Sequence, residues 1–181
     1  LCRKLIFSLA AIRNYLSLIK FSHTIFAMPF ALIGFTLAIV REDSTFRWST
    51  LLLVILCMVF ARSAAMAFNR YIDERYDKLN PRTAVREIPA GVIPKRNALW
   101  FVLLNCAMFV LVTYNINTIC FYLSPVALFV VLFYSYTKRF TPLCHLVLGV
   151  GLSLAPIGAY LAVTGVFHLL PLLFSFAVLT W

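Results

Sequence analysis

The sequence predicts an all-α membrane protein, a bundle of helices that crosses the lipid bilayer several times. Its mean hydropathy is +0.95, with 63% hydrophobic and only 12% charged residues, where soluble domains carry roughly 25% charged residues. Six long apolar runs follow one another along the 181 residues. Non-helical backbone is not tolerated against lipid, and a helix of about 20 apolar residues crosses the hydrocarbon. Each run therefore predicts one spanning helix.

The predicted spans lie at residues 21–40, 49–68, 97–115, 119–137, 143–164 and 167–181. Before them, residues 5–19 form a shorter apolar stretch that contains Arg13, which favours a helix in the membrane interface over a further span. The connections at 115–118 and 164–168 are short and uncharged. The helices that they join should therefore pack as antiparallel neighbours in a compact bundle.

The longest connection, residues 69–96, is expected to be a folded functional element. Loops of more than about 15 residues between packed helices are usually functional or disordered. This one is rich in aliphatic residues and has turn residues at Asn80-Pro81, Pro89 and Gly91, which argues against disorder.

The basic residues predict the orientation of the bundle. A net charge of +10 would suggest a nucleic-acid partner in a soluble protein, but here the charges follow the topology, and we expect no such partner. Thirteen of the 16 Lys and Arg residues fall on one side, in the N-terminal segment, the 69–96 loop and the 138–142 loop. The positive-inside rule places these segments, with the N-terminus, on the cytoplasmic side of the cell's inner membrane.

The five cysteines and three histidines predict no metal centre. No Cys-x-x-Cys pair is present, and no histidine stands at a metal-ligand spacing. We interpret the cysteines as small apolar packing residues. His168 is predicted on the side opposite to the 69–96 loop and, like the other histidines, is assigned no chemistry.

Asn69, Asp73 and Asp77 recur every four residues directly after the second span. On a helix that continues beyond the membrane they form one stripe about 12 Å long. Carboxylate and amide oxygens are hard ligands that suit Mg²⁺, which usually takes further ligands from substrate phosphates. The stripe therefore predicts a site for magnesium and a diphosphate at the membrane surface.

A solvated helix end is the alternative interpretation of the same segment. Arg70 with Glu74, and Glu74 with Lys78, are spaced as ordinary i,i+4 ion pairs. These pairs account for Glu74 but leave Asp73 and Asp77 on the other stripe.

Several basic residues should converge on this stripe. Arg62 lies two turns before Asn69 on the same face and within the hydrocarbon, where a charge is costly and should face a polar cavity. There it could hold an anionic group. Lys20 begins the first span, and Lys138 and Arg139 end the fourth on the same side. Each could serve only as an interface anchor, but together they indicate an anion site.

The segment Arg62-Ser-Ala-Ala-Met-Ala-Phe-Asn69-Arg-Tyr-Ile-Asp73-Glu-Arg-Tyr-Asp77 resembles the first aspartate-rich motif of the UbiA superfamily of intramembrane prenyltransferases. Two further segments match that family in order: Asn80-Pro81-Arg82-Thr83 through Gly91, and Tyr136-Thr137-Lys138-Arg139-Phe140-Thr141. The resemblance covers essentially the whole chain. Where many members have Arg-Pro-Leu-Pro, this chain has Arg86-Glu87-Ile88-Pro89, which we interpret as a subgroup variant.

The resemblance implies a bundle of nine helices, of which about six are present here, and a single domain over residues 1–181. Asn69, Asp73 and Asp77 would serve Mg²⁺, with Asp73 and Asp77 catalytic. Arg62, Lys138, Lys20 and Arg139 would bind the diphosphate. A second aspartate motif would follow the sixth helix, beyond Trp181, so residues 1–181 alone are expected to be inactive.

By this resemblance, the protein would transfer a polyprenyl group from a prenyl diphosphate to an aromatic acceptor, most specifically 4-hydroxybenzoate in quinone biosynthesis. A menaquinone-pathway aromatic acid or a naphthoate is the alternative acceptor. A transporter or channel would also place charges between helices, but it predicts paired broken helices in a pseudo-symmetric repeat, which we do not find. A purely structural membrane subunit would not need Arg62 in the hydrocarbon.

Overall fold

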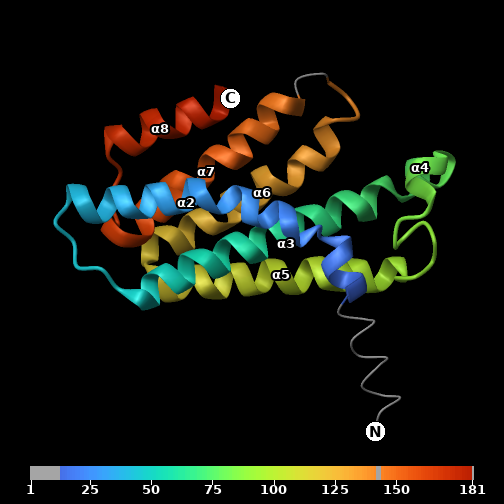
Figure 1. Cartoon of the computed structure of the whole chain (residues 1–181), viewed down its shortest axis with the longest axis horizontal. Coiled ribbons are helices and arrows are strands. Elements are labelled where there is room, and N and C mark those ends of the chain that lie inside the picture. Colours follow the sequence, from blue (N-terminus) through green and yellow to red (C-terminus); the bar gives the residue numbers. More distant parts are fainter. Residues whose placement is uncertain (1–12, 142–143, 181) are drawn as a thin grey trace, which may run out of the picture.

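The computed structural model describes residues 13–141 and 144–180 and is helical throughout its secondary structure (Figure 1). The helices are α2 (Phe21–Arg41), α3 (Trp48–Leu79), α4 (Pro81–Ala84), α5 (Lys95–Ile116), α6 (Thr118–Thr137), α7 (Cys144–Thr164) and α8 (Leu169–Thr180). The predicted all-α class is confirmed. Of the predicted interfacial segment 5–19, residues 13–18 are helical and residues 5–12 lie outside the described residues.

Each of the six predicted apolar runs contains one helix of the structure, and these helices differ in length. In the described part of the chain, α3, α5, α6 and α7 are long and apolar enough to cross a membrane. Met28–Arg41, the apolar stretch counted within α2, and α8 are shorter. By length and composition together, the described residues support four of the six predicted spans.

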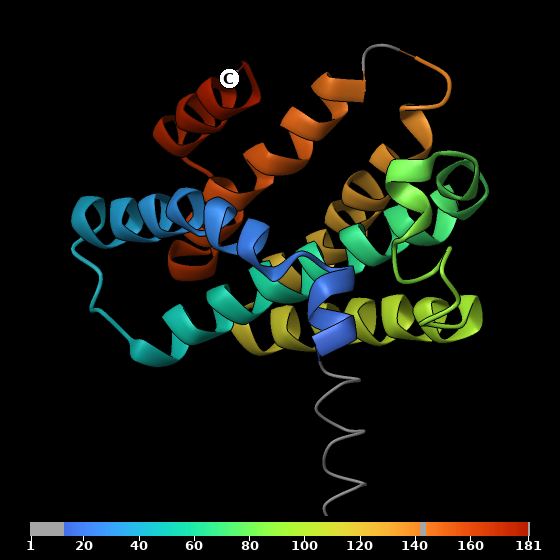
Figure 2. The same cartoon turned by 45° about the vertical axis from the view of Figure 1, so that its right-hand side comes forward.

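α3 is the central helix of the bundle and packs against α2, α5, α6 and α7, while α2 and α8 both pack against α7 (Figure 2). Asn117 alone separates α5 from α6. Its side chain accepts a hydrogen bond from the Cys120 amide at 2.7 Å and donates one to the Leu161 carbonyl at 2.7 Å. This residue therefore fixes the tight turn and attaches it to α7.

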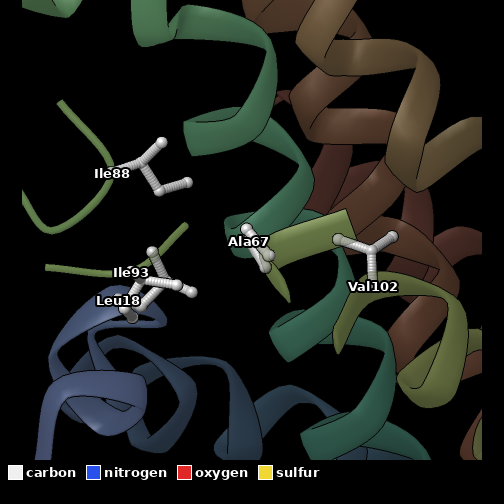
Figure 3. Packing of buried hydrophobic residues seen from close by; sticks show 6 residues of the cluster. Leu18, Ala67, Ile88, Ile93 and Val102 are labelled. Carbon is white, nitrogen blue, oxygen red and sulfur yellow. The ribbon is translucent and has the colours of Figure 1, made fainter. Parts of the chain in front are cut away.

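The segment between α4 and α5 is held by apolar packing. Ile88 and Ile93 are buried with Leu18, with Ala67 of α3 and with Val102 of α5 (Figure 3). This cluster attaches the segment to three separate parts of the chain. The polar side chains that the segment carries are consequently held at one end of the bundle.

Helices α2 and α7 approach each other closely at Gly34. A Cβ atom built on Gly34 would overlap the backbone carbonyl of Pro156, which cannot move without the helix. Around this contact Ala31, Phe35, Val54, Ala159 and Ala162 are buried together. The missing side chain of Gly34 therefore sets the distance between these two helices.

We predict that Gly34→Ala lowers the free energy of unfolding by about 1–3 kcal/mol, because the new methyl group forces α2 away from α7. Thermal unfolding in detergent measures the loss. Gly151→Ala is the matched control: a Cβ there meets nothing within 4 Å, and alanine favours helix over glycine. Equal destabilisation by both substitutions would contradict the packing account.

Candidate functional site

The polar stripe lies on the part of α3 that extends beyond the predicted span. This helix runs without interruption for 32 residues, from Trp48 to Leu79. Asn69, Asp73 and Asp77 therefore remain on one helical face, as their spacing predicts. Asn80 then ends α3 with an extended backbone and caps α4, where its side chain accepts a hydrogen bond from the Arg82 amide.

This face borders a cavity of about 700 Å³, called the polar cavity below. All seven site residues predicted from the sequence line it: Lys20, Arg62, Asn69, Asp73, Asp77, Lys138 and Arg139. The other lining residues are Met66, Arg70, Tyr76, Asn80, Thr83 and Arg86. Six basic side chains thus border the cavity, against two acidic ones. The predicted convergence of cations on the stripe is present.

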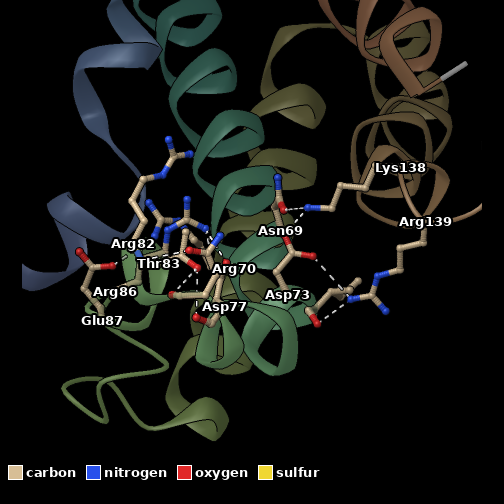
Figure 4. Close-up of polar contacts among 12 residues, drawn as sticks. Asn69, Arg70, Asp73, Asp77, Arg82, Thr83, Arg86, Glu87, Lys138 and Arg139 are labelled. Atoms are coloured by element: carbon tan, nitrogen blue, oxygen red, sulfur yellow. Dashed lines mark hydrogen bonds and ion pairs between the residues drawn. The ribbon is translucent and has the colours of Figure 1, made fainter. Parts of the chain in front are cut away.

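The end of α6 supplies two of these cations. The Lys138 ammonium donates to Asn69 Oδ1 and to Asp73 Oδ2, which places one positive charge between two oxygen atoms of the stripe (Figure 4). Arg139 lies 3.6 Å from Asp73 Oδ1 and donates to the Ile72 carbonyl at 2.7 Å. Two residues from the end of α6 therefore fix the position of the Asp73 carboxylate.

Asp77 is neutralised from the segment between α4 and α5. Arg86 Nη1 donates to both carboxylate oxygens of Asp77 at 2.9 Å, and only 9% of the Asp77 side chain is exposed. Thr83 Oγ1 donates to the Asp77 backbone carbonyl at 3.0 Å, which holds α4 against the end of α3. Arg86 was not predicted as a cavity residue, although the length of the 69–96 connection indicated that this connection carries function.

The expected pair between Arg70 and Glu74 is wrong. Glu74 binds Lys78 and Lys95, each at 2.8 Å. Arg70 is buried and lies 3.7 Å from Glu87, whose other carboxylate oxygen accepts a hydrogen bond from Ser17. The fold brings Lys95 and Glu87 beside α3, so partners distant in sequence replace one of the two local pairs. The Glu74–Lys78 pair is confirmed.

A second cavity of about 460 Å³, called the apolar cavity below, lies between α3, α5, α6 and α7. It shares three residues with the polar cavity: Arg62, Met66 and Asn69. From Asn69 to Val54 it follows α3 over about 22 Å of helix axis. The hydropathy of the sequence could not reveal the apolar cavity, because apolar residues that line a cavity and apolar residues that pack against other helices give the same hydropathy pattern.

Arg62 lies where the two cavities meet. It is on the membrane part of α3, and its buried Nε atom has no hydrogen-bond partner among the described residues. A guanidinium with an unused donor beside a polar cavity can bind an anionic group. The expectation that Arg62 faces a polar cavity is therefore met.

The stripe offers oxygen ligands for a cation rather than a closed metal centre. Within the described residues, no three His, Cys, Asp or Glu side chains gather closely enough to bind a metal ion. The available donors are the Asn69 amide oxygen and the carboxylates of Asp73 and Asp77. Such donors suit a hard divalent cation whose remaining ligands come from phosphate or water. The Lys138 ammonium shows that a cation is already held between Asn69 and Asp73.

The opposite end of the bundle carries a separate polar group. Glu42 accepts a hydrogen bond from Tyr160 at 2.9 Å and lies 3.7 Å from His168. None of these residues lines the polar cavity. Among the cysteines that the structure describes there is no disulfide, while Cys2 lies outside the described residues.

Comparison with known proteins agrees with the resemblance found in the sequence. The UbiA prenyltransferase family matches residues 27–181. The 4-hydroxybenzoate octaprenyltransferase of Aliivibrio salmonicida is 35% identical over 117 residues, which are 64% of this chain and 40% of that protein. The corresponding protein of Tolumonas auensis is 36% identical over 133 residues, 73% of this chain and 46% of that protein. The matched regions thus cover less than half of these relatives.

Solved structures share the fold. The apo structure of a UbiA homolog from Aeropyrum pernix K1 has a TM-score of 0.79 and 34% identity, covering 88% of this chain and 60% of that one. A UbiA homolog from Archaeoglobus fulgidus bound to DMAPP and Mg²⁺ has a TM-score of 0.76 and 19% identity, covering 92% and 60%. At that identity, the second match shows the fold alone.

We predict that Arg86→Ala speeds amide hydrogen exchange in residues 81–94 by about tenfold, because a charge-assisted hydrogen bond contributes roughly 1.5–3 kcal/mol and this one is partly exposed. Arg82→Ala is the matched control, since Arg82 is exposed and does not line the polar cavity. Unchanged exchange in the Arg86 variant would show that its ion pair with Asp77 does not hold this segment.

Proposed function

The chain belongs to the UbiA prenyltransferase family, and from this premise we propose that it takes part in Mg²⁺-dependent transfer of a polyprenyl group from a prenyl diphosphate to an aromatic acid. The observation that carries the proposal is the junction of a cation-rich polar cavity with an elongated apolar cavity at Arg62, Met66 and Asn69. A prenyl diphosphate has the same two parts, an anionic head and an apolar tail. Its reacting carbon joins them and would lie at this junction.

The diphosphate would bind among the basic side chains of the polar cavity. Arg62, Lys138, Lys20 and Arg139 line it and would neutralise the negative charge that grows on the diphosphate as its bond to the prenyl carbon breaks. Arg70 and Arg86 add to this positive field. Two acidic residues line the cavity, and Glu87 lies 3.7 Å from Arg70, which leaves an excess of three positive charges for an anion.

Asn69, Asp73 and Asp77 would hold the magnesium ion with the diphosphate, which makes Asp73 and Asp77 the catalytic carboxylates of the proposal. When bound, Mg²⁺ supplies Lewis-acid stabilisation of the departing phosphate oxygens. Lys138 and Arg86 contact these carboxylates in the structure. Both cations also line the same cavity. In the proposal they would contact the diphosphate once Mg²⁺ occupies the carboxylates.

The apolar cavity would receive the prenyl tail and keep water from the reactive centre. Breaking the carbon–oxygen bond leaves an allylic cation, which the electron-rich ring of the acceptor attacks before it loses a ring proton. Water at this position would instead give a prenyl alcohol. A site enclosed by apolar helices favours transfer to the ring over this hydrolysis.

The acceptor that we propose is 4-hydroxybenzoate. Relatives from Aliivibrio and Tolumonas carry the name 4-hydroxybenzoate octaprenyltransferase. The proposed location is the inner membrane, with the polar cavity facing the cytoplasm, because the 69–96 connection, Lys138 and Arg139 concentrate the basic residues at that end.

We predict that Asp73→Asn lowers prenyl transfer by at least about 100-fold, the usual loss when one group that stabilises transition-state charge is removed. The assay measures transfer of a labelled prenyl diphosphate to 4-hydroxybenzoate in membranes that contain the complete protein, with and without a Mg²⁺ chelator. Glu74→Gln is the matched control, because this neighbouring acid binds Lys78 and Lys95 and does not line the polar cavity.

Loss of product with the chelator and with Asp73→Asn, but not with Glu74→Gln, would support the proposed function. If product forms only with a naphthoate or another aromatic acid, the proposed prenyl transfer would stand, and that acid would replace 4-hydroxybenzoate as the proposed acceptor. Absence of product with every acid, in membranes shown to contain folded protein, would contradict the proposal.

A further inference from the structure

The glycines of α2 and α7 fall into two groups. At Gly34 and Gly149 a Cβ atom would collide with a neighbouring backbone: the carbonyl of Pro156 at Gly34, and the carbonyl oxygen of Leu179, at 2.5 Å, at Gly149. Close helix packing therefore explains both. At Gly151 and Gly158 a Cβ atom would meet nothing within 4 Å, so helix packing explains neither.

Both unexplained glycines line the apolar cavity. A glycine within a helix costs about 1 kcal/mol relative to alanine, and no segment among the described residues requires that cost here. A side chain at either position would occupy part of the apolar cavity. The two glycines thus enlarge a space that the described residues leave unfilled.

The two glycines lie at different distances from the polar cavity along α7. Gly151 and Gly158 are two helical turns apart, about 10 Å along the axis, and lie on the same face. α7 begins at Cys144, shortly after Lys138 at the end of α6, so Gly151 is nearer to the polar cavity. Gly158 lies farther along the apolar cavity by more than the length of one isoprenoid unit.

We propose that Gly151 and Gly158 determine which isoprenoid tails the protein accepts, by leaving room for successive units of the tail against the backbone of α7. The inference rests on the proposed function and adds the residues that determine its specificity. A side chain at Gly158 blocks the distal part of the cavity and leaves the proximal part open. A side chain at Gly151 blocks the path closer to the diphosphate.

The test compares two donors in membranes that contain the complete protein: geranyl diphosphate, with two isoprenoid units, and octaprenyl diphosphate, with eight. The measured quantity is the ratio of kcat/KM for octaprenyl to geranyl donor. This ratio does not depend on how much of each variant folds. The variants are Gly158→Leu, Gly151→Leu and their alanine counterparts, and the matched control is Ala107→Leu, at an exposed α5 position that does not line the apolar cavity.

We predict that Gly158→Leu lowers this ratio by at least about tenfold with little change for geranyl diphosphate, in line with the 10–200-fold effect of misfitting methylenes in apolar pockets. Gly151→Leu should reduce transfer from both donors, and the alanine variants should give smaller changes in the same direction. Ala107→Leu should leave the ratio unchanged.

An unchanged ratio in Gly158→Leu, or an equal change of the ratio in Ala107→Leu, would overturn the assignment of Gly158. Undiminished transfer from both donors by Gly151→Leu would overturn the assignment of Gly151. Absence of transfer by the unsubstituted protein from either donor to any aromatic acid would contradict the proposed function instead. The two failures are therefore distinguishable.

Discussion

The structure depends on neutralising two carboxylates at the end of a membrane helix. Asp73 and Asp77 are largely buried, and their cations come from elsewhere: Lys138 from the end of α6, Arg86 from the segment after α4. An unpaired charge in such surroundings costs several kcal/mol. The pairing therefore requires the end of α6 and the segment after α4 to meet α3. Burial of Ile88 and Ile93 supplies the packing that keeps the segment there.

The same constraint produces a cavity with an excess of positive charge. Two acids are matched by nearby cations, and further basic side chains, including Arg62 with its unpartnered Nε atom, border the same space. An anion completes this charge balance better than water does, because a partly enclosed site strengthens electrostatic interactions. The apolar cavity continues from that point into the bundle. The adjacency of the two environments, more than any single residue, favours an amphiphilic substrate.

Local patterns in the sequence predicted the parts of the site that depend on helix periodicity. The four-residue spacing put Asn69, Asp73 and Asp77 on one face, and the seven-residue spacing added Arg62. The partners of Arg70 and the position of Arg86 were not predictable, because both depend on how the 85–94 segment folds back on α3. The apolar cavity was missed because hydropathy records composition and not unfilled space.

The central claim is that Asn69, Asp73 and Asp77 hold a divalent cation together with a diphosphate. Electron paramagnetic resonance of Mn²⁺, used in place of Mg²⁺, tests it directly on the complete purified protein with a non-reactive geranyl thiolodiphosphate. The account predicts Mn²⁺ that is bound when the analogue is present and released in Asp73→Asn and Asp77→Asn, with Glu74→Gln unaffected. Equal Mn²⁺ binding by all four proteins would contradict it.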